Sequence, residues 1–525
     1  MTLTGLMQTT PLTLRTIFDR MRTVYADGEV VDNGGRRTYG ELSERVLRLC
    51  RVLTDDLGIK PGDRVASFAY NSARHLELYY AVPLIGAVLH TLNIRLYEEQ
   101  IRYIVHHAED RVVFVDAALS DQFAPIAPSL ATVERTVTLG DEYEDLLAAA
   151  PPLHPSQLPD VPEDAAFGLC YTSGTTGMPK GVLSSHRAMF LHSMSTCMAD
   201  TIGLRETDRV LPIVPMFHAF GWGLPYAAPF TGAELIFHGA DSSAEATGAL
   251  IEREHATIAA AVPTIWKGVL PLLQRGDFDA STLRLIFVGG SASPRALIEA
   301  YDDLGIEYLQ VWGMTETGPL ACASRPRRRH QALSRDEQLD IRERTGTILP
   351  GIEARVVDEA GAEIATDGVT VGELEVRGPW IASGYYRGEG ADRFNNSWLR
   401  TGDMAWMEPD GYFRIVDRAK DLVKSGGEWI SSVELEGHLL AHPEVADAAV
   451  VGISSKKWDE RPVAVVVARD GVPITLDSVR EFLTARVARW WLPDAVVVVD
   501  EIPKTSVGKL DKKVLRDQLA HMELP

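Results

Sequence analysis

The chain has 525 residues, of which 46% are hydrophobic and 24% charged, a composition typical of soluble globular proteins. At about 150 residues per unit, this length predicts roughly three or four structural units. The formal net charge of −21 excludes the basic surface that nonspecific binding to nucleic acid or to an anionic membrane requires, so a polyanionic ligand must meet local cations or backbone N–H groups.

The sequence predicts a cytoplasmic protein without a membrane span. Its N-terminal stretch MTLTGLMQTTPLTL lacks the basic start and the long apolar core of a signal peptide. No run of about 18 apolar residues is present that would cross a bilayer. The four cysteines are scattered without a CxxC pair, which indicates small buried residues in a reducing compartment rather than a zinc site or a disulfide framework.

Residues 13–147 alternate helical and strand patterns, which predicts layered α/β structure. Within this region, 40–57 is typical of a helix. The proline-rich stretch 148–164 is interpreted as a connector between subdomains. Short apolar strands are expected at 64–70, 112–115, 167–171, 181–184, 258–262 and 283–288, and a helix is expected to begin near Arg187.

A β-rich texture with many turns runs from 351 to 411, and the charged stretch 417–421 follows it. Ser431 and Glu434 then fit a capping box that opens a helix. We therefore predict an α/β fold: a large N-terminal domain, 1–418, of layered α/β subdomains plus a β-rich subdomain, and a small mobile C-terminal α+β domain, 419–525. In the small domain we expect helices at 431–441 and 476–489 and strands at 448–451, 463–468 and 495–499.

The most specific motif is the segment 171–180, YTSGTTGMPK. Its glycines allow tight turns, its hydroxyl and N–H groups suit phosphate oxygens, and Lys180 adds a cation. The same composition also occurs in ordinary surface hairpins. The segment is not a Walker A loop, because Pro179 replaces the second glycine, Gly181 replaces the Ser/Thr that holds magnesium, and a strand pattern follows.

With this segment and seven further motifs, the chain resembles the acyl-adenylate-forming (AMP-binding) superfamily of acyl-CoA synthetases, peptide-synthetase adenylation domains and beetle luciferases. The motifs follow the family's order and cover the chain from residue 165 to its end. The strings KSGGEWISSVELE and ARWWLPD look most like bacterial medium- and long-chain fatty acyl-CoA synthetases. The seven motifs are PMFHA at 215–219, VGGSAS at 288–293, WGMTE at 312–316, TGD at 401–403, DR at 417–418, KSGGEW at 424–429 and PKTSVGK at 503–509.

The resemblance implies two steps. A carboxylate attacks the α-phosphate of ATP and releases pyrophosphate, and a thiol then attacks the acyl-adenylate. Because an anion attacks a polyanion in the first step, catalysis requires positioning and charge neutralisation. Thr172 and Glu316 are suited to hold Mg²⁺, which takes oxygen ligands. By resemblance Thr315 contacts the α-phosphate and Lys509 bridges carboxylate and phosphate oxygens, whereas without its motif Lys509 would be an ordinary solvated lysine.

Nucleotide binding needs an apolar or aromatic slot for adenine and polar groups for ribose. Trp312, where Tyr is more frequent in the superfamily, and the segment 289–292 would form this slot. Asp403 would accept from ribose hydroxyls beside Arg418, unless it is only a turn residue of TGDMAW. ATP or AMP binding is thus assigned to Thr172, Ser173, Gly174, Thr175, Thr176, Gly177, Lys180, His218, Gly290, Ser291, Ala292, Gln310, Val311, Trp312, Gly313, Thr315, Asp403, Arg418, Lys420, Lys424, Trp429 and Lys509.

Trp222 aligns with a tryptophan that gates the fatty-acid tunnel of long-chain enzymes, and Phe220 and Gly290 join it in the predicted acyl pocket. The run 219–221, AFG, departs from the usual residues and would narrow or reroute the tunnel. Simple core packing of Trp222 is the alternative. His218 would lie between the acyl and nucleotide sites, or else be a satisfied core histidine, and is assigned a catalytic role with Lys509, Glu316 and Thr315.

The resemblance implies that the two domains close for adenylation and that the small one then rotates for the thiol step. Lys420 occupies the hinge position, although a plain surface charge is the alternative. Lys424 would face the nucleotide during the second step. The run 325–329 is interpreted as a solvated loop or as a contact to a CoA phosphate. The CoA channel is assigned to Gly426, Gly427 and Trp429.

The leading hypothesis is an enzyme, an AMP-forming acyl-CoA synthetase that uses ATP, Mg²⁺ and coenzyme A on a medium- or long-chain fatty acid. A ligase that loads a carrier-protein thiol and a ligase specialised in one half-reaction remain alternatives. A non-catalytic sensor of acyl or nucleotide ligands is the alternative from another class, against which intact Thr172, Glu316 and Lys509 argue. The resemblance also implies a homodimer formed through the N-terminal region.

Overall fold

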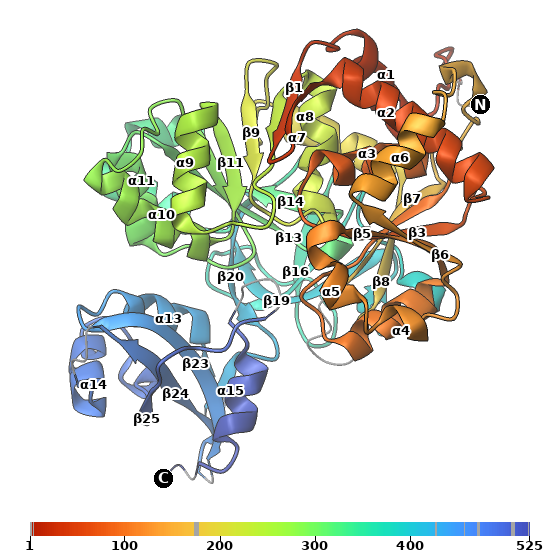
Figure 1. The fold of residues 1–525 in the computed structure, drawn as a ribbon. Helices are drawn as coiled ribbons and strands as arrows, with labels where there is room; N and C mark the ends of the chain where they lie inside the picture. The colour runs from red at the N-terminus through yellow and green to blue at the C-terminus, as the bar shows by residue number, and fades with distance from the viewer. Residues whose placement is uncertain are drawn as a thin grey trace.

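The structure is a computed structural model of the chain, and it describes residues 3, 5–172, 178–425, 428–455, 457–469, 473–505, 510–522 and 524, without the side chain of Glu428. Three β-sheets flanked by helices organise this part of the chain (Figure 1). The α/β fold class predicted from the sequence is confirmed. None of the described helices is both long and apolar enough to cross a bilayer.

A six-stranded sheet carries the phosphate-loop motif at one edge. In sheet order its strands are β6 (Arg135–Leu139), β5 (Asp110–Asp116), β3 (Arg64–Phe68), β4 (Val88–Thr91), β7 (Ala166–Tyr171) and β8 (Gly181–Ser185). All neighbours are parallel except β7 and β8. Its helices are α2 (Tyr39–Arg51), α3 (Ala73–Leu84), α4 (Glu98–Ala108), α5 (Ser120–Phe123) and α6 (Asp141–Ala149).

The proline-rich stretch 148–164 runs from α6 to β7 inside this one sheet. The interpretation of the stretch as a connector between subdomains is therefore wrong. It is held against α2, since Leu153 N donates to Leu47 O at 3.1 Å and both leucines are buried. The prolines disfavour an α-helix, and the stretch forms a short 3-10 turn at Pro155–Gln157 as it crosses to the next strand. Composition alone cannot distinguish such a crossing segment from a domain linker.

The second sheet has 14 strands and two halves that share β13. In sheet order the strands are β16 (Glu353–Val357), β17 (Gly372–Arg377), β19 (Trp398–Met407), β20 (Tyr412–Arg418), β15 (Gly346–Ile348), β14 (Leu320–Ala323), β13 (Glu307–Gly313), β12 (Leu285–Val288), β11 (Ile258–Ala261), β9 (Arg209–Pro212), β10 (Glu234–Ile236), β1 (Glu29–Asp32) and β2 (Gly35–Thr38), with β18 (Phe394–Asn395) on β19. Its helices, with those that lie between the two sheets, are α1 (Leu14–Thr23), α7 (His186–Cys197), α8 (Leu224–Thr231), α9 (Ala244–Glu254), α10 (Pro263–Arg275), α11 (Arg295–Asp303) and α12 (Arg335–Glu343).

Strand β13 changes partner type along its length. Gln310 pairs in parallel with Val288 of β12, and the next residue, Val311, pairs antiparallel with Ala323 of β14. The motif residues Trp312 and Gly313 therefore lie where the buried parallel half of the sheet gives way to the antiparallel half. Carboxyl ends of parallel strands are where α/β sheets bind ligands, so this junction is a suitable site.

A small α+β unit follows the turn at 418–422. Its five strands are, in order, β22 (Glu428–Ile430), β21 (Val423–Ser425), β24 (Asp459–Ala468) and β23 (Val445–Ser455), with β25 (Ala495–Val498) on β24. Its helices are α13 (Ser432–Leu440), α14 (Leu476–Thr484) and α15 (Lys512–Leu519). Ser431 is the N-cap of α13 as predicted, because its Oγ accepts the N–H of Glu434 at 3.1 Å.

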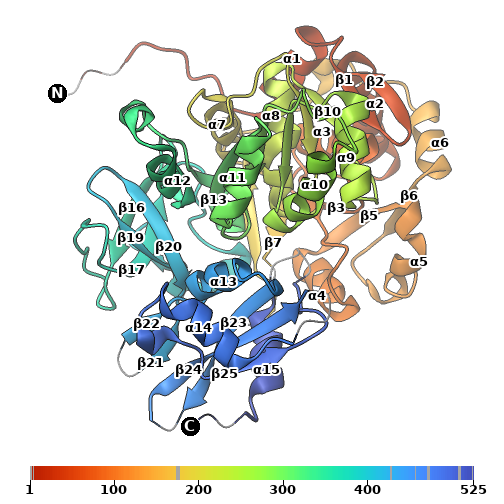
Figure 2. The same cartoon turned by 90° about the vertical axis from the view of Figure 1, so that its left-hand side faces the viewer.

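Helix α13 lies on the side of this unit that faces the rest of the molecule (Figure 2). Asp417, buried on β20, accepts the N–H of Ser432 at 2.8 Å, so a strand of the large sheet satisfies the first turn of a small-unit helix. Lys267 of α10 donates to the carbonyl of Ala446 at 2.7 Å. The two parts of the chain are therefore in direct polar contact in this structure.

Candidate active site

Strands β7 and β8 hold the two ends of the phosphate-loop motif together. They pair antiparallel as far as Tyr171 and Gly181. Thr172 N then donates to Lys180 O at 2.9 Å, and Lys180 N donates to Thr172 Oγ1 at 3.2 Å. The motif thus begins and ends as a closed hairpin stem at the carboxyl end of β7. The predicted contacts Ser173, Gly174, Thr175, Thr176 and Gly177 lie outside the described residues.

Tyr385 connects the base of this motif to Glu316. Glu316 is buried in the short turn after β13, and its Oε1 accepts the hydroxyl of Tyr385 at 2.5 Å. Lys180 Nζ lies 5.3 Å from the centroid of the same tyrosine ring, within cation–π distance. Burial, and then the Glu316 carboxylate, raise the pKa of Tyr385, so its phenol keeps the proton that it donates.

Tyr385 is not among the residues predicted from the sequence. A tyrosine in a glycine-containing stretch carries no spacing signal, and only the fold brings it between Glu316 and Lys180. The oxygen atoms of Glu316 and Thr172 are the hard ligands that Mg²⁺ prefers, and Mg²⁺ commonly completes its shell with substrate phosphates and water. The chemistry of these two donors therefore fits the predicted metal.

The predicted adenine and ribose residues form one hydrogen-bonded row. Trp312 Nε1 donates to Asp403 Oδ2 at 3.0 Å, and Arg418 Nε contacts Asp403 Oδ1 at 2.8 Å. Asp403 is buried inside β19 and pairs with Arg418 of β20, so the alternative of a simple turn residue is wrong. The carboxylate therefore fixes the indole edge and the guanidinium at one place.

Replacing Trp312 by phenylalanine tests this row. Phenylalanine keeps an aromatic ring but lacks the N–H that donates to Asp403. A hydrogen bond to a charged group is worth about 1.5–3 kcal/mol. We expect the KM for ATP to rise by about tenfold or more while kcat changes much less, as measured by initial rates of pyrophosphate release. Trp398→Phe, on the same strand as Asp403 but between Arg355 and Arg377, should leave the KM for ATP unchanged. An unaltered KM for ATP in the Trp312 variant would contradict the assignment.

The glycine segment after β12 separates the predicted nucleotide and acyl residues. Ser293 N donates to Gln310 Oε1 at 3.1 Å, which ties the segment to β13. A Cβ on Gly289 would lie 3.0 Å from Val311 Cγ2 and 3.2 Å from Trp222 Cη2. Val311 and Trp222 thus both pack close to the position that a side chain at 289 would occupy, and glycine leaves the space for both. Gly290, Ser291 and Ala292 follow in the same segment, with a φ of 93° at Gly290.

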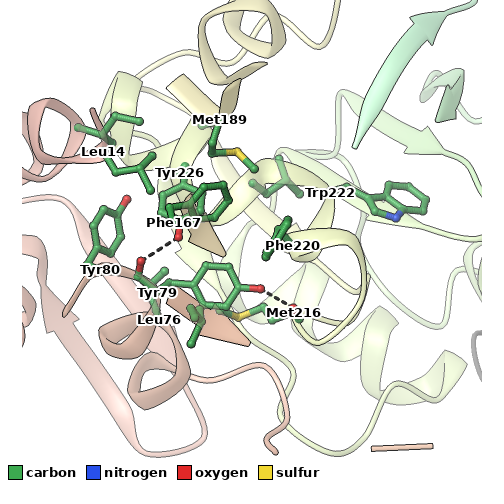
Figure 3. Close-up of a cluster of buried hydrophobic side chains, with 14 of the residues drawn as sticks. Leu14, Leu76, Tyr79, Tyr80, Phe167, Met189, Met216, Phe220, Trp222 and Tyr226 are labelled. Carbon is green, nitrogen blue, oxygen red and sulfur yellow. Dashed lines mark hydrogen bonds between the residues drawn. The ribbon is translucent and has the colours of Figure 1, made fainter. Parts of the chain in front are cut away.

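The segment Ala219–Gly223 forms one left-handed turn. The φ angles of Ala219, Phe220, Gly221, Trp222 and Gly223 are 37°, 44°, 56°, 49° and 77°. Left-handed backbone costs roughly 1–2 kcal/mol for each residue other than glycine, and three of these five have side chains. Surrounding packing must therefore hold the turn, and Phe220 lies in a cluster of buried side chains (Figure 3). The predicted site residue His218 precedes it in extended backbone and is half-buried, unlike a core histidine.

The remaining predicted residues lie at the junction and on the small unit. Lys420 is exposed in the turn between β20 and β21. Lys424 Nζ lies 4.7 Å above the ring of Trp429, its partner across the β21–β22 hairpin. Thr315 is buried beside Glu316. Gly426, Gly427 and Lys509 lie outside the described residues, so their roles stay predictions.

Comparison with known proteins adds three kinds of similarity. Residues 18–386 match the family model described as AMP-binding enzyme, and residues 434–509 match the AMP-binding enzyme C-terminal domain. A 3-methylmercaptopropionyl-CoA ligase of Ruegeria lacuscaerulensis is 40% identical over 98% of each chain. A long-chain-fatty-acid–CoA ligase of Thermus thermophilus is 44% identical over 92% of this chain and 90% of its own.

Among solved structures, the anthranilate CoA ligase AuaEII in complex with anthranoyl-AMP superposes with a TM-score of 0.88. It is 25% identical and covers 97% of this chain and 98% of its own. The match extends through the large sheets and the small C-terminal unit alike, given that coverage. Family model, sequence relatives and structural neighbour agree with the motifs and their convergence. The chain therefore belongs to the AMP-binding enzyme family.

Proposed function

We propose that this protein activates an apolar aliphatic carboxylic acid with ATP to an acyl-adenylate and transfers the acyl group to coenzyme A. The coarser class, an AMP-forming acid–CoA ligase, follows from the family and from its named relatives. The observation that carries the proposal is the convergence of Glu316 and Lys180 on Tyr385 at the carboxyl end of β7. The predicted phosphate loop and the acidic turn after β13, which are far apart in the sequence, thereby meet at one tyrosine.

In this proposal the segment 172–180 binds the ATP phosphates, with Thr172 and Glu316 as ligands of Mg²⁺. When bound, Mg²⁺ neutralises phosphate charge. Trp312 provides the adenine face and Asp403 accepts from the ribose. Tyr385 orients the Glu316 carboxylate by donating to one of its oxygens, which leaves the other oxygen available for the metal.

The same proposal divides the chain into domains at 418/419 and places the hinge at Lys420. That division is supported by the change of sheet between β20 and β21. Rotation there would expose a second face of the small domain, with Trp429 beside the CoA channel, to the acyl-adenylate. A cytoplasmic homodimer is part of the proposal through family resemblance alone.

The acid is proposed as apolar because Trp222 lies beside Gly289 and the described residues packed around Trp222 are mostly aromatic and aliphatic. The relatives differ in their named acids, a methylthio-substituted propionate in one and a long-chain fatty acid in the other. What these two acids share is an apolar chain attached to the carboxylate. We propose for this protein only the shared feature, an acid with an apolar chain, and neither of the two named acids.

The test supplies ATP, Mg²⁺ and a panel of straight-chain acids together with 3-(methylthio)propanoate, and follows pyrophosphate and AMP with and without CoA. Pyrophosphate release that needs no CoA, followed by thioester formation with it, supports the proposal. Thioester formed only from supplied acyl-AMP would instead indicate a half-reaction specialist. Transfer to a carrier-protein thiol but not to CoA would indicate a carrier-loading ligase, and no turnover in any arm would indicate a sensor.

Replacement of Lys509 by alanine separates the two half-reactions. We expect adenylation to fall by about 10²- to 10³-fold, since the variant lacks a cation aimed at charge developing in the transition state. Thioester formation from supplied acyl-AMP should change by only a few fold. Lys513→Ala, an exposed lysine on α15, is the matched control and should leave both steps unchanged. Equal losses in both half-reactions would count against the assigned role.

A further inference from the structure

We infer that His107, in the last turn of α4, is a positioning residue for adenylation. It holds the phosphate-loop motif and the segment 385–390 in fixed relative positions. The inference rests on the proposed function, in which Thr172 and Glu316 bind the same Mg²⁺ ion. It adds a residue, remote from both ligands, that sets how they lie relative to each other.

The two proposed metal ligands belong to different sheets. Thr172 follows β7 of the six-stranded sheet, whereas Glu316 follows β13 of the 14-stranded sheet. Hydrogen bonds within either sheet do not determine the distance between the two ligands, so contacts between the sheets must do so. These contacts matter for the rate, because a misplacement of about 1 Å can cost a hundredfold.

The segment 385–390, which lies between β17 and β18 in the chain, packs against the phosphate-loop motif. A Cβ on Gly390 would lie 2.9 Å from Lys180 Nζ, and a Cβ on Gly181 would lie 3.2 Å from Tyr386 Cβ. The segment therefore lies along the start of β8, where the motif ends. Its first residue is the tyrosine that joins the motif to the acidic turn after β13.

The end of α4 contacts the same segment. The ring of His107 lies 5.6 Å from the ring of Tyr386 at an interplanar angle of 90°, and His107 Nε2 lies 3.7 Å from Glu389 Oε1. One residue beyond the helix, Glu109 Oε1 accepts from Arg387 Nη2 at 2.6 Å. Because this ion pair is exposed it contributes little stability, whereas the side chain of His107 is only 12% exposed. His107 therefore makes the better-shielded of these contacts.

The same imidazole binds the first residue of the phosphate-loop motif. Its Nδ1 lies 2.7 Å from the hydroxyl of Tyr171, which is also the last residue of β7. Burial raises the pKa of Tyr171 and lowers the pKa of His107, so a protonated phenol meets a neutral imidazole. Since Nε2 faces the Glu389 carboxylate, Nε2 carries the ring proton and Nδ1 accepts from Tyr171. One ring therefore connects the motif to the segment 385–390.

Replacing His107 by phenylalanine tests this connection. Phenylalanine keeps a ring between Tyr103 and Tyr386 but removes the acceptor for Tyr171. The motif should then shift relative to the segment 385–390, and kcat/KM for ATP in adenylation should fall by about 10- to 100-fold. Pyrophosphate release at saturating acid measures this change. Thioester formation from supplied acyl-AMP uses no triphosphate and should keep the wild-type rate.

Asparagine at position 107 distinguishes the hydrogen bond from ring packing. The side-chain oxygen of asparagine can accept where Nδ1 of His107 does, although the ring is lost. His107→Asn should therefore adenylate faster than His107→Phe. A ring that served only to fill space would give the opposite order, and a slower asparagine variant would overturn the inference.

A double-mutant cycle with Tyr171→Phe tests the contact itself. Both single variants lack the same hydrogen bond, so the protein with Phe at both 107 and 171 should adenylate about as fast as the slower single variant. Losses that multiply in the double variant would overturn the inference. His106→Phe is the matched control, because His106 is exposed one position earlier on α4, where it contacts the carbonyl of Ser129. This control should leave both half-reactions unchanged.

The outcomes separate this inference from the function on which it rests. Adenylation at the wild-type rate by folded His107→Phe protein would overturn the inference and leave the proposed function intact. Should that variant fail to fold by circular dichroism, Tyr171→Phe still decides the question, since a wild-type rate in this variant would also overturn the inference. Failure of the wild-type protein to activate any acid would instead reject the proposed function, and the inference with it.

Discussion

Alanine at Gly313 should abolish adenylation. A Cβ at this position would lie 1.9 Å from Pro319 O and 2.9 Å from Pro319 C, and backbone atoms cannot rotate away as a side chain can. Relief requires displacement of the loop 313–319, which carries Thr315 and Glu316. Because a misplacement of about 1 Å can cost a hundredfold in rate, displacing both should lower kcat/KM by 10³-fold or more. The measurement is ATP-dependent pyrophosphate release, with unfolding by urea recorded in parallel.

The matched control for Gly313 is Gly437 on α13. An alanine there meets nothing within 4 Å and should stabilise the helix slightly, by up to about 1 kcal/mol, without changing the rate. The Gly313 variant should also unfold at lower urea concentration, because the added methyl group clashes with backbone atoms of Pro319 that cannot rotate away. Adenylation at the wild-type rate by a Gly313→Ala protein would show that the loop between β13 and β14 does not position Glu316.

The second large effect expected is a steep loss of stability in mild acid. Burial lowers the pKa of His192 to about 3 and those of His75, His186 and His238 to about 4. An unfolded histidine has a pKa near 6.5, so the unfolded chain takes up protons that the folded chain excludes. The stabilisation is therefore complete above about pH 6.5 and is lost as the pH falls from there toward 4.

The expected slope is about 1.4 kcal/mol per pH unit for each such histidine, or about 5.5 kcal/mol per pH unit for the four together. Glu436 opposes part of it, because burial raises its pKa to about 7 and the folded state then holds a proton that the unfolded state has lost. That carboxyl contributes stability that decreases as the pH rises from about 4.5 toward 7. These five groups alone account for about three more protons bound by the unfolded than by the folded chain, and burial also raises the pKa values of Glu77, Asp110 and Asp417, which lowers the slope further. Urea unfolding between pH 4.5 and 6.5 measures the slope.

His192→Gln isolates one of these contributions. Glutamine retains an acceptor for the N–H of Leu320, which His192 Nε2 accepts at 3.2 Å, but it does not titrate. The slope of unfolding free energy against pH should fall by about 1.4 kcal/mol per pH unit. His521→Gln, an exposed histidine, should leave the slope as it was. If the unfolding free energy changed with pH equally in wild type and in the His192 variant, burial of this histidine would not contribute to the loss of stability in acid.

Local patterns in the sequence were sufficient for most elements of the fold. Apolar runs bounded by turn residues predicted strands such as β3 and β12, and the Ser431 cap predicted the start of α13. These features depend on neighbours along the chain. Strand partners do not, and neither the sharing of β13 between two halves of one sheet nor the path of 148–164 had a local signal.

The same distinction applies to the site. The motifs gave Glu316, Lys180, Trp312 and Asp403, but not the bond between Trp312 and Asp403, which joins residues far apart in sequence. The left-handed turn at 219–223 could not be predicted from the sequence, for a different reason. Its five residues include three that ordinarily avoid positive φ, so local preference argues against the observed backbone and tertiary packing overrides it.

Strand β20 has a consequence for protein engineering. Successive strand residues point to opposite faces, and here Arg418 contacts Asp403 while Asp417 accepts from Ser432. An insertion or deletion of one residue before them would exchange the two directions and break both contacts at once. A chimaera that imports a foreign C-terminal unit should therefore be spliced beyond Arg418, with a serine or another small donor kept at position 432.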